Sequence, residues 1–174
     1  MKFFRLSLLF ISLLFVGCST PTYFREGIPN FAKVKDNVYR GGQPPDKIGW
    51  DNLKRLGVKY VIKLNMESEG SDDYAEKIGM IVIRIPITTI EQTIGKPPKE
   101  KIDFALKSID KDGTFIHCTH GEDRTMLVVG IWLVEYFGLP KDMVYRQMDS
   151  AGFHPLLRGL YWYWEENVIE NIRK

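Results

Sequence analysis

A cysteine and an arginine six positions apart carry the strongest chemical signal in this sequence. Cys118 and Arg124 lie in residues 117–125, which read HCTHGEDRT and join an apolar strand to an apolar helix. A tight loop at that junction points its backbone N–H groups inward, and the helix dipole adds to their attraction for an anion. These surroundings favour the thiolate form of Cys118, which is a nucleophile, and Arg124 offers two parallel N–H groups to phosphate oxygens. The segment therefore predicts covalent chemistry on a bound oxyanion.

The pattern His-Cys-x-x-Gly-x-x-Arg-Thr resembles the signature of the cysteine-dependent phosphatases, and we call residues 117–125 the signature loop. That superfamily includes tyrosine and dual-specificity phosphatases and phosphatase-like phytases, and the likeness extends to residues 38–44 and 56–64. It implies a phosphomonoester hydrolase in which Cys118 forms a cysteinyl-phosphate that water then hydrolyses. By the same resemblance, Arg124 stabilises the transition state, Thr125 hydrogen-bonds the sulfur and His117 orients the loop. The implied phosphate-binding residues are Thr119, His120, Gly121, Glu122, Asp123 and Arg124.

The general acid is open between two carboxylates. Members of this superfamily commonly carry an Asp on the loop after the second strand, where it protonates the leaving oxygen. Here that loop, residues 88–98, contains Glu91 as its only carboxylate. Asp123, immediately before Arg124, resembles the acid inside the signature of myotubularin-like phosphatases. We predict Asp123 as the general acid, with Glu91 as the alternative and Asp103 ranked below both.

Metal catalysis is not expected. His117 and His120 flank Cys118, but zinc sites in proteins take three or four protein ligands and the chain has one further histidine, His154. We therefore expect no metal and no other cofactor.

The N-terminus predicts export. Lys2 and Arg5 precede an apolar run over residues 6–16, which is too short to span a bilayer as a helix and is typical of a signal peptide. The following Phe15-Val16-Gly17-Cys18 resembles the bacterial lipobox. We expect a signal peptide at residues 1–17, lipidation of Cys18, a tether at 18–37 and a phosphatase domain at 38–174. The protein would then be anchored in the cell envelope, periplasmic or outer membrane, whereas a conventionally cleaved signal is the alternative.

Strand and helix patterns alternate along the rest of the chain. This alternation predicts an α/β fold with a mostly parallel central sheet flanked by helices, and the resemblance makes it dual-specificity-phosphatase-like. In such sheets ligands bind beyond the carboxyl ends of the strands, where Cys118 is expected. The expected strands are 38–40, 58–64, 80–87 and 114–118. The expected helices are 44–56, 71–78, 99–109, 127–137, 141–150 and 156–172, with four aromatic residues at 161–164 packed mostly against the core.

Charge restricts the partners. The 24 basic and 22 acidic residues leave a net charge of +2, and Lys2 and Arg5 account for this excess, which argues against a nucleic-acid partner. The substrates that remain are phosphotyrosine-type protein or aryl phosphates, followed by inositol polyphosphates or phosphoinositides. Lys96, Lys99 and Lys101 on and beside the 88–98 loop would favour a highly charged ligand. A non-catalytic phosphate-binding module is a further alternative.

Overall fold

A five-stranded sheet forms the centre of the molecule, in the order β1-β2-β5-β3-β4. The computed structural model describes residues 26–168, so the predicted signal peptide and Cys18 lie outside the described residues. Strand β1 (Ala32–Lys35) runs antiparallel to β2 (Val38–Gly42), whereas β2, β5 (Thr114–Cys118), β3 (Tyr60–Lys63) and β4 (Ile81–Arg84) are parallel. The prediction of a mostly parallel α/β sheet is confirmed.

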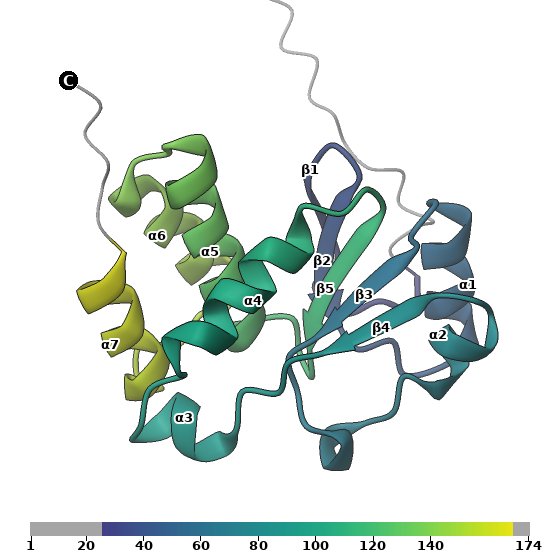
Figure 1. Ribbon diagram of the computed structural model, residues 1–174, viewed down its shortest axis with the longest axis horizontal. Coiled ribbons are helices and arrows are strands. Elements are labelled where there is room, and N and C mark those ends of the chain that lie inside the picture. The colour runs from purple at the N-terminus through teal and green to yellow at the C-terminus, as the bar shows by residue number, and fades with distance from the viewer. Residues whose placement is uncertain (1–25, 169–174) are drawn as a thin grey trace, which may run out of the picture.

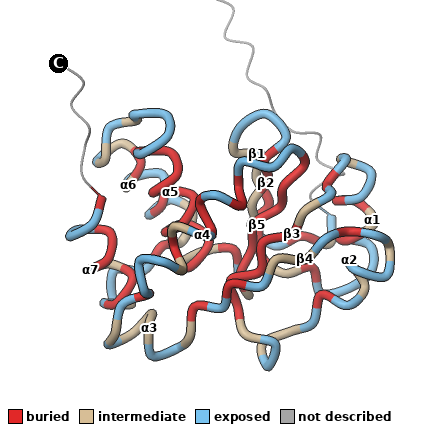
Figure 2. Tube along the Cα trace, in the orientation of Figure 1, coloured by how far each residue is buried: buried red, intermediate tan, exposed pale blue. Residues whose placement is uncertain are grey.

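Helices cover both faces of the sheet (Figure 1). Trp50 and Leu53 of α1 share one hydrophobic cluster with Phe115 of β5, whereas Ile116, the next residue, belongs to a second cluster with Leu127 of α5. Successive strand residues point to opposite faces, so β5 is buried from both sides, as Figure 2 shows along its length. The helices are α1 (Lys47–Arg55), α2 (Asp73–Lys77), α3 (Thr89–Thr93), α4 (Lys99–Ile109), α5 (Asp123–Phe137), α6 (Lys141–Ser150) and α7 (Arg158–Asn167).

The largest difference from the expected elements lies at the start of the domain. Residues 28–37 were expected in the tether, but Ile28 and Phe31 are buried beside α1, and β1 pairs with β2. The folded part therefore begins before residue 38. Residues 88–98, expected as a loop, contain the short helix α3, which starts with a capping box between Thr88 and Glu91.

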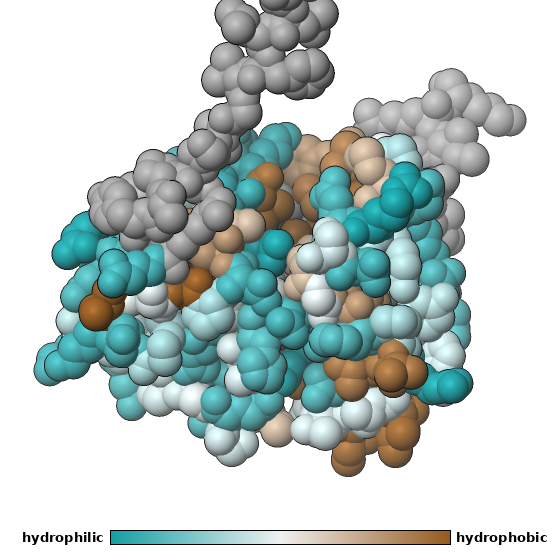
Figure 3. All heavy atoms as spheres, turned by 180° about the vertical axis from the view of Figure 1, so that it is seen from behind, coloured by the Kyte–Doolittle hydropathy of each residue, from teal (hydrophilic) through white to brown (hydrophobic). Residues whose placement is uncertain are grey.

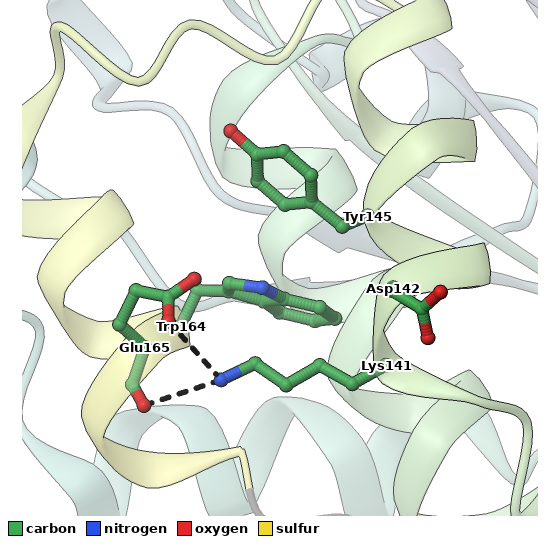
Figure 4. Close-up of a pocket in the computed structure, with 5 residues that line it drawn as sticks. All are labelled: Lys141, Asp142, Tyr145, Trp164 and Glu165. Carbon is green, nitrogen blue, oxygen red and sulfur yellow. Dashed lines mark hydrogen bonds and ion pairs between the residues drawn. The ribbon is translucent and has the colours of Figure 1, made fainter.

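The aromatic residues at 161–164 lie mainly in the core, as expected. Tyr163 and Trp164 are 5% and 1% exposed. Trp164 also forms the floor of a hollow of about 390 Å³ between α6 and α7, where Lys141 reaches Glu165 (Figure 4). Among residues 26–168, no helix has the length and apolar character needed to cross a membrane.

Candidate active site

The signature loop begins where β5 ends at the carboxyl edge of the sheet. Cys118 is the last residue of β5 and is 3% exposed, and α5 begins five residues later at Asp123. Gly121 adopts φ +78°, and a Cβ there would lie 2.2 Å from the backbone carbon of Gly41. A side chain at this position would therefore be strained and would collide with β2. The loop can curl tightly against β2 because neither Gly41 nor Gly121 carries a side chain.

Two residues that flank the β1-β2 hairpin, Asn30 before β1 and Gln43 after β2, hold the loop from outside. The backbone N–H of Gln43 donates to the carbonyl oxygens of Cys118 and Thr119 at 2.9 and 3.2 Å. The side chain of Asn30 donates to the carbonyl of His120 at 3.2 Å and to Glu122 Oε1 at 2.9 Å. These bonds hold the carbonyl oxygens of three consecutive loop residues and so fix the curl of the loop.

The guanidinium of Arg124 is held by a carboxylate from another part of the chain. Arg124 Nη1 and Nη2 donate to Glu69 Oε2 and Oε1 at 2.8 and 2.6 Å, and Nη1 also donates to the carbonyl of Ile87 at 3.2 Å. Hydrogen bonds from Arg124 are the main cause that lowers the pKa of Glu69 to about 2. Burial lowers the pKa of Arg124, but Glu69 and the charge of Cys118 raise it more, so the guanidinium stays charged.

Glu69 leaves part of the guanidinium available. An arginine carries five N–H donors, and the bonds to Glu69 and Ile87 use three of them. The Nε–H and one N–H of Nη2 form no hydrogen bond within the described residues. These two donors point the same way along one edge of the planar group, the geometry that binds two oxygens of a phosphate. Glu69 can therefore orient Arg124 without competing with an oxyanion.

His117 lies under the loop in a fully buried polar cluster. Its Nε2 is 2.9 Å from Asp72 Oδ2 and its Nδ1 is 3.3 Å from the carbonyl oxygen of Cys118. A carboxylate can only accept a hydrogen bond, so the contact with Asp72 fixes the orientation of the imidazole through Nε2. Lys63 Nζ lies 3.5 Å from Asp72 Oδ1 on the other side. One buried carboxylate therefore contacts both Lys63 and His117, and this cluster supports the end of β5 that carries Cys118.

Glu69 and Asp72 belong to the candidate site, although the sequence did not predict them. Both lie in the segment between β3 and α2, which contains a 3-10 turn at Glu67–Glu69. The available signal was a group of carboxylates directly after a buried strand whose carboxyl end neighbours that of β5. We call residues 65–72 the orienting segment.

Two threonines complete the inner surface. Thr119 Oγ1 donates to Glu69 Oε1 at 3.3 Å, so the orienting segment contacts the loop at a second point. Thr125 Oγ1 is buried and makes no hydrogen bond to any described residue. An unpaired buried hydroxyl is costly unless it has a partner at some stage, which fits a hydroxyl that bonds a charged sulfur or a ligand. The assignment of Thr125 to the sulfur stays a prediction.

The two candidate general acids have different surroundings. Asp123 Oδ1 accepts from the backbone N–H of His154 at 2.7 Å and lies 3.1 Å from its ring Nδ1. Asp123 Oδ2 has no hydrogen bond to the described residues. Both oxygens of Glu91 are held by Lys101 at 2.6 and 2.8 Å, and one also accepts from the N–H of Thr88. Burial raises the pKa of Glu91, but Lys101 and Thr88 lower it more, which makes this carboxyl a poor proton donor.

Glu122, Asp123 and His154 are the described residues that approach the arrangement of a metal site, with possible ligand atoms within 4.8 Å of one another. Each of these side chains already bonds within the protein, Glu122 with Asn30 and Asp123 with His154. The contacts of Asp123 with His154 hold the loop of residues 151–154 against the signature loop.

The lysines expected to favour a highly charged ligand are neutralised. Lys96 pairs with Glu166, Lys99 pairs with Asp103 at 2.6 Å, and Lys101 pairs with Glu91 at 2.6 Å. Asp103, the third candidate for the general acid, is thus paired with Lys99 on α4. These pairs weaken the case for a polyanionic ligand.

A comparison with protein-family models decides the family. The model described as "Tyrosine phosphatase family" matches residues 28–133, which include β1, the orienting segment and the signature loop. The chain belongs to the tyrosine phosphatase family. Cysteine-dependent phosphatases were the superfamily that the signature predicted. No curated protein matches the sequence.

Solved structures confirm the fold of this tyrosine phosphatase family member. TpbA of P. aeruginosa, in a serine-substituted form bound to pTyr, has a TM-score of 0.65 at 17% identity, covering 79% of this chain and 83% of its own. The catalytic domain of the PP-IP phosphatase SIW14 from S. cerevisiae has a TM-score of 0.63 at 19% sequence identity, and the match covers 81% of this chain and 90% of that domain. DUSP15 has a TM-score of 0.60 at 19% sequence identity, and the match covers 79% of this chain and 89% of DUSP15. The fold is therefore dual-specificity-phosphatase-like.

The Glu69 contact leads to a prediction within this family. Glu69→Gln keeps the shape of the side chain but removes the charge that holds Arg124, so we expect kcat for an aryl phosphate to fall by about 10²-fold, the cost of misplacing a reacting group by about 1 Å. Steady-state kinetics tests it. Glu67→Gln is the control because Glu67 is more exposed and bonds Lys63 and Arg84 instead. Equal kcat values for the two variants would contradict a role for Glu69.

The same carboxylate predicts a pH effect. The pKa of Glu69 is lowered to about 2 in the folded state, so its ionised form stabilises the fold. That contribution is complete above the ordinary pKa of about 4.5 and disappears as the pH falls toward 2. We expect Glu69→Gln to lower the melting temperature at pH 7 and to reduce the loss of stability on acidification. Parallel pH curves for the variant and the wild type would contradict this linkage.

Proposed function

We propose that this protein hydrolyses phosphate monoesters through a cysteinyl-phosphate intermediate. The observation that carries the proposal is Arg124, held by Glu69 with two parallel donors available, at the start of α5 beside Cys118. The N-terminus of α5 favours the thiolate nucleophile, and Asp72 holds the imidazole of His117 next to Cys118. These features support catalysis over a module that only binds phosphate.

The reaction takes two displacements at phosphorus. Cys118 Sγ attacks phosphorus while the bond from phosphorus to the leaving oxygen breaks, and Asp123 gives its proton to that oxygen. Water then attacks the phosphorus, Asp123 takes a proton from it, and the S–P bond breaks to release inorganic phosphate and the thiolate. Arg124 and the loop N–H groups stabilise the negative oxygens in both transition states, and Thr125 donates a hydrogen bond to the departing sulfur.

Phosphotyrosine-type protein or aryl phosphates are the substrate class that we rank first. The lysines near the site are paired with carboxylates, and Glu122 and Asp123 add negative charge beside the loop. This balance favours a ligand with a single phosphate over an inositol polyphosphate. The fold is shared both with TpbA, solved with pTyr, and with the PP-IP phosphatase SIW14, so inositol phosphates remain the alternative substrate.

Phosphate release from a panel of compounds tests the proposal. The panel contains phosphotyrosine and phosphoserine peptides, phosphoinositides and inositol hexakisphosphate, each with wild type and Cys118→Ser. We expect release from phosphotyrosine peptides by the wild type alone. Equal and negligible release by both proteins from every compound would favour the phosphate-binding module.

The general acid has its own prediction. We expect Asp123→Asn to lower kcat by about 10²-fold or more and to remove the basic limb of the pH–rate profile, because the amide can accept from His154 but cannot donate a catalytic proton. Glu91→Gln is the control and should retain that limb. Loss of the limb in Glu91→Gln, with a normal profile for Asp123→Asn, would reverse the assignment.

We also propose that Cys18 carries lipid and anchors the protein in the bacterial cell envelope. The basic Lys2 and Arg5, the apolar run and the lipobox-like Phe15-Val16-Gly17-Cys18 support this proposal. Metabolic labelling with a fatty acid should mark the wild type and not Cys18→Ala. Labelling of both proteins would exclude Cys18 as the modified residue.

A further inference from the structure

Three strongly exposed aliphatic side chains lie on α3, at its C-terminal cap and just before α7, two helices whose backbones touch. Ile90, Ile94 and Leu156 are 67%, 77% and 84% exposed. Single exposed hydrophobic residues are normal on a protein surface, but a cluster of them marks an interaction site. In Figure 3 hydrophobic atoms gather at the lower right of the molecule, the corner where α3 lies in that turned view.

The backbone connects this cluster directly to the site. Ile90 follows Ile87, whose carbonyl accepts from Arg124, by three residues, and Leu156 follows His154, which bonds Asp123, by two residues. Ile90 and Ile94 are four residues apart, so they share one face of α3 and its C-terminal end. We call Ile90, Ile94 and Leu156 the apolar rim.

Close backbone packing between α3 and α7 holds the apolar rim in place. At Gly159 in the first turn of α7, a Cβ would lie 2.0 Å from the carbonyl oxygen of Gly95 and 2.1 Å from that of Glu91. The backbones of α3 and α7 therefore touch, and no larger residue fits between them. The rim side chains project from a fixed support instead of folding back onto it.

The shape and charge of the rim favour a lipid surface as its partner. The three side chains protrude, so they suit a soft apolar layer better than a protein partner, which would need matching cavities. Arg158, at the start of α7, is exposed and makes no ion pair with the residues that the structure describes. Basic and aliphatic side chains side by side are typical of proteins that lie at the surface of anionic membranes.

We propose that the apolar rim inserts into the surface of a phospholipid bilayer and presents the signature loop to phosphate monoesters at that surface. This proposal rests on the proposed function for the chemistry and adds where the substrate is met. It does not require a lipid substrate, since a phosphorylated protein at the membrane would reach the same site.

Hydrogen exchange of the full chain, measured with and without vesicles of equal parts phosphatidylcholine and phosphatidylglycerol, tests the rim. We expect backbone amides of residues 89–94 to exchange at least about tenfold more slowly on the vesicles, which corresponds to about 1.4 kcal/mol. The variant Ile90→Ser/Ile94→Ser/Leu156→Ser should lose this slowing. The matched control Phe104→Ser removes a 54% exposed side chain from α4 and should retain it.

Three results would overturn the proposal. The first is equal exchange of residues 89–94 with and without vesicles, and the second is slowing that survives in the triple variant. The third is slowing that depends on protein concentration without vesicles, which would assign the rim to a second copy of the chain. Hydrolysis of para-nitrophenyl phosphate in solution is measured in parallel. If the wild type did not hydrolyse it, the proposed function would be refuted. The exchange measurement would still decide whether the apolar rim binds the vesicles.

Discussion

Replacing Arg124 by lysine is expected to lower kcat/KM for para-nitrophenyl phosphate by about 10³-fold. Removing one donor that stabilises a transition-state oxyanion costs about 10²–10³ in rate, and lysine loses the planar fork altogether. An ammonium group cannot bind both oxygens of Glu69 and still offer two parallel donors to phosphate. Steady-state kinetics measures the loss, and a melting curve shows whether the variant is folded.

Arg146→Lys supplies the matched control for this substitution. Arg146 lies on α6, its side chain is 70% exposed, and it pairs with Asp142 four residues earlier. We expect this variant to retain the wild-type kcat/KM. If Arg124→Lys also kept activity within a few-fold of the wild type, the fork would not be the oxyanion site and the proposed mechanism would be wrong.

The second large effect is expected on stability. Asp72→Asn should lower the free energy of unfolding by about 3–5 kcal/mol, the range found when one partner of a buried ion pair is removed. Asp72 is fully buried and faces Lys63 and His117, whose side chains are 1% and 0% exposed. The neutral amide would remove the buried counter-charge that faces Lys63 and weaken the contact with His117, and Glu67, which is more exposed, would be the remaining carboxylate beside Lys63. Urea unfolding at neutral pH measures the change.

Two further variants make the result specific. Asp73→Asn changes the neighbouring, exposed carboxylate and should alter stability by less than about 0.5 kcal/mol. Adding Lys63→Met to Asp72→Asn removes the buried charge that Asp72 faced and should restore part of the loss. If Asp72→Asn were as stable as the wild type, the buried pair of Asp72 and Lys63 would not contribute to the stability of the fold.

Some elements were predictable from the sequence because local and tertiary signals agreed. Helix α4 places Ile102, Leu106 and Ile109 on one buried face, and its observed bounds match the expected ones. Strand β5 also has the expected bounds, since its apolar run ends at the signature. Helix α3 was missed because five residues give too little periodicity and its capping box lay in a segment expected to be a loop.

The site was predictable only where one contiguous segment carries it. Residues 117–125 contain both the pattern and its geometry, so Cys118 and Arg124 follow directly from the sequence. Glu69 lies 55 positions from Arg124, and Asp72 lies 45 positions from His117. No local pattern distinguishes these carboxylates from Glu67 or Asp73, which are exposed. Only the parallel pairing of β3 with β5 brings the orienting segment to the loop.

The two hydrogen bonds from Arg124 to Glu69 affect the affinity of the protein for small tetrahedral anions. A free arginine gives up about 2 kcal/mol of rotamer entropy when it is immobilised. Here the side chain is already fixed before any ligand arrives, so that loss occurs during folding and not at the moment of encounter. Vanadate and tungstate, which carry no organic group, should therefore bind tightly through the loop and the arginine alone.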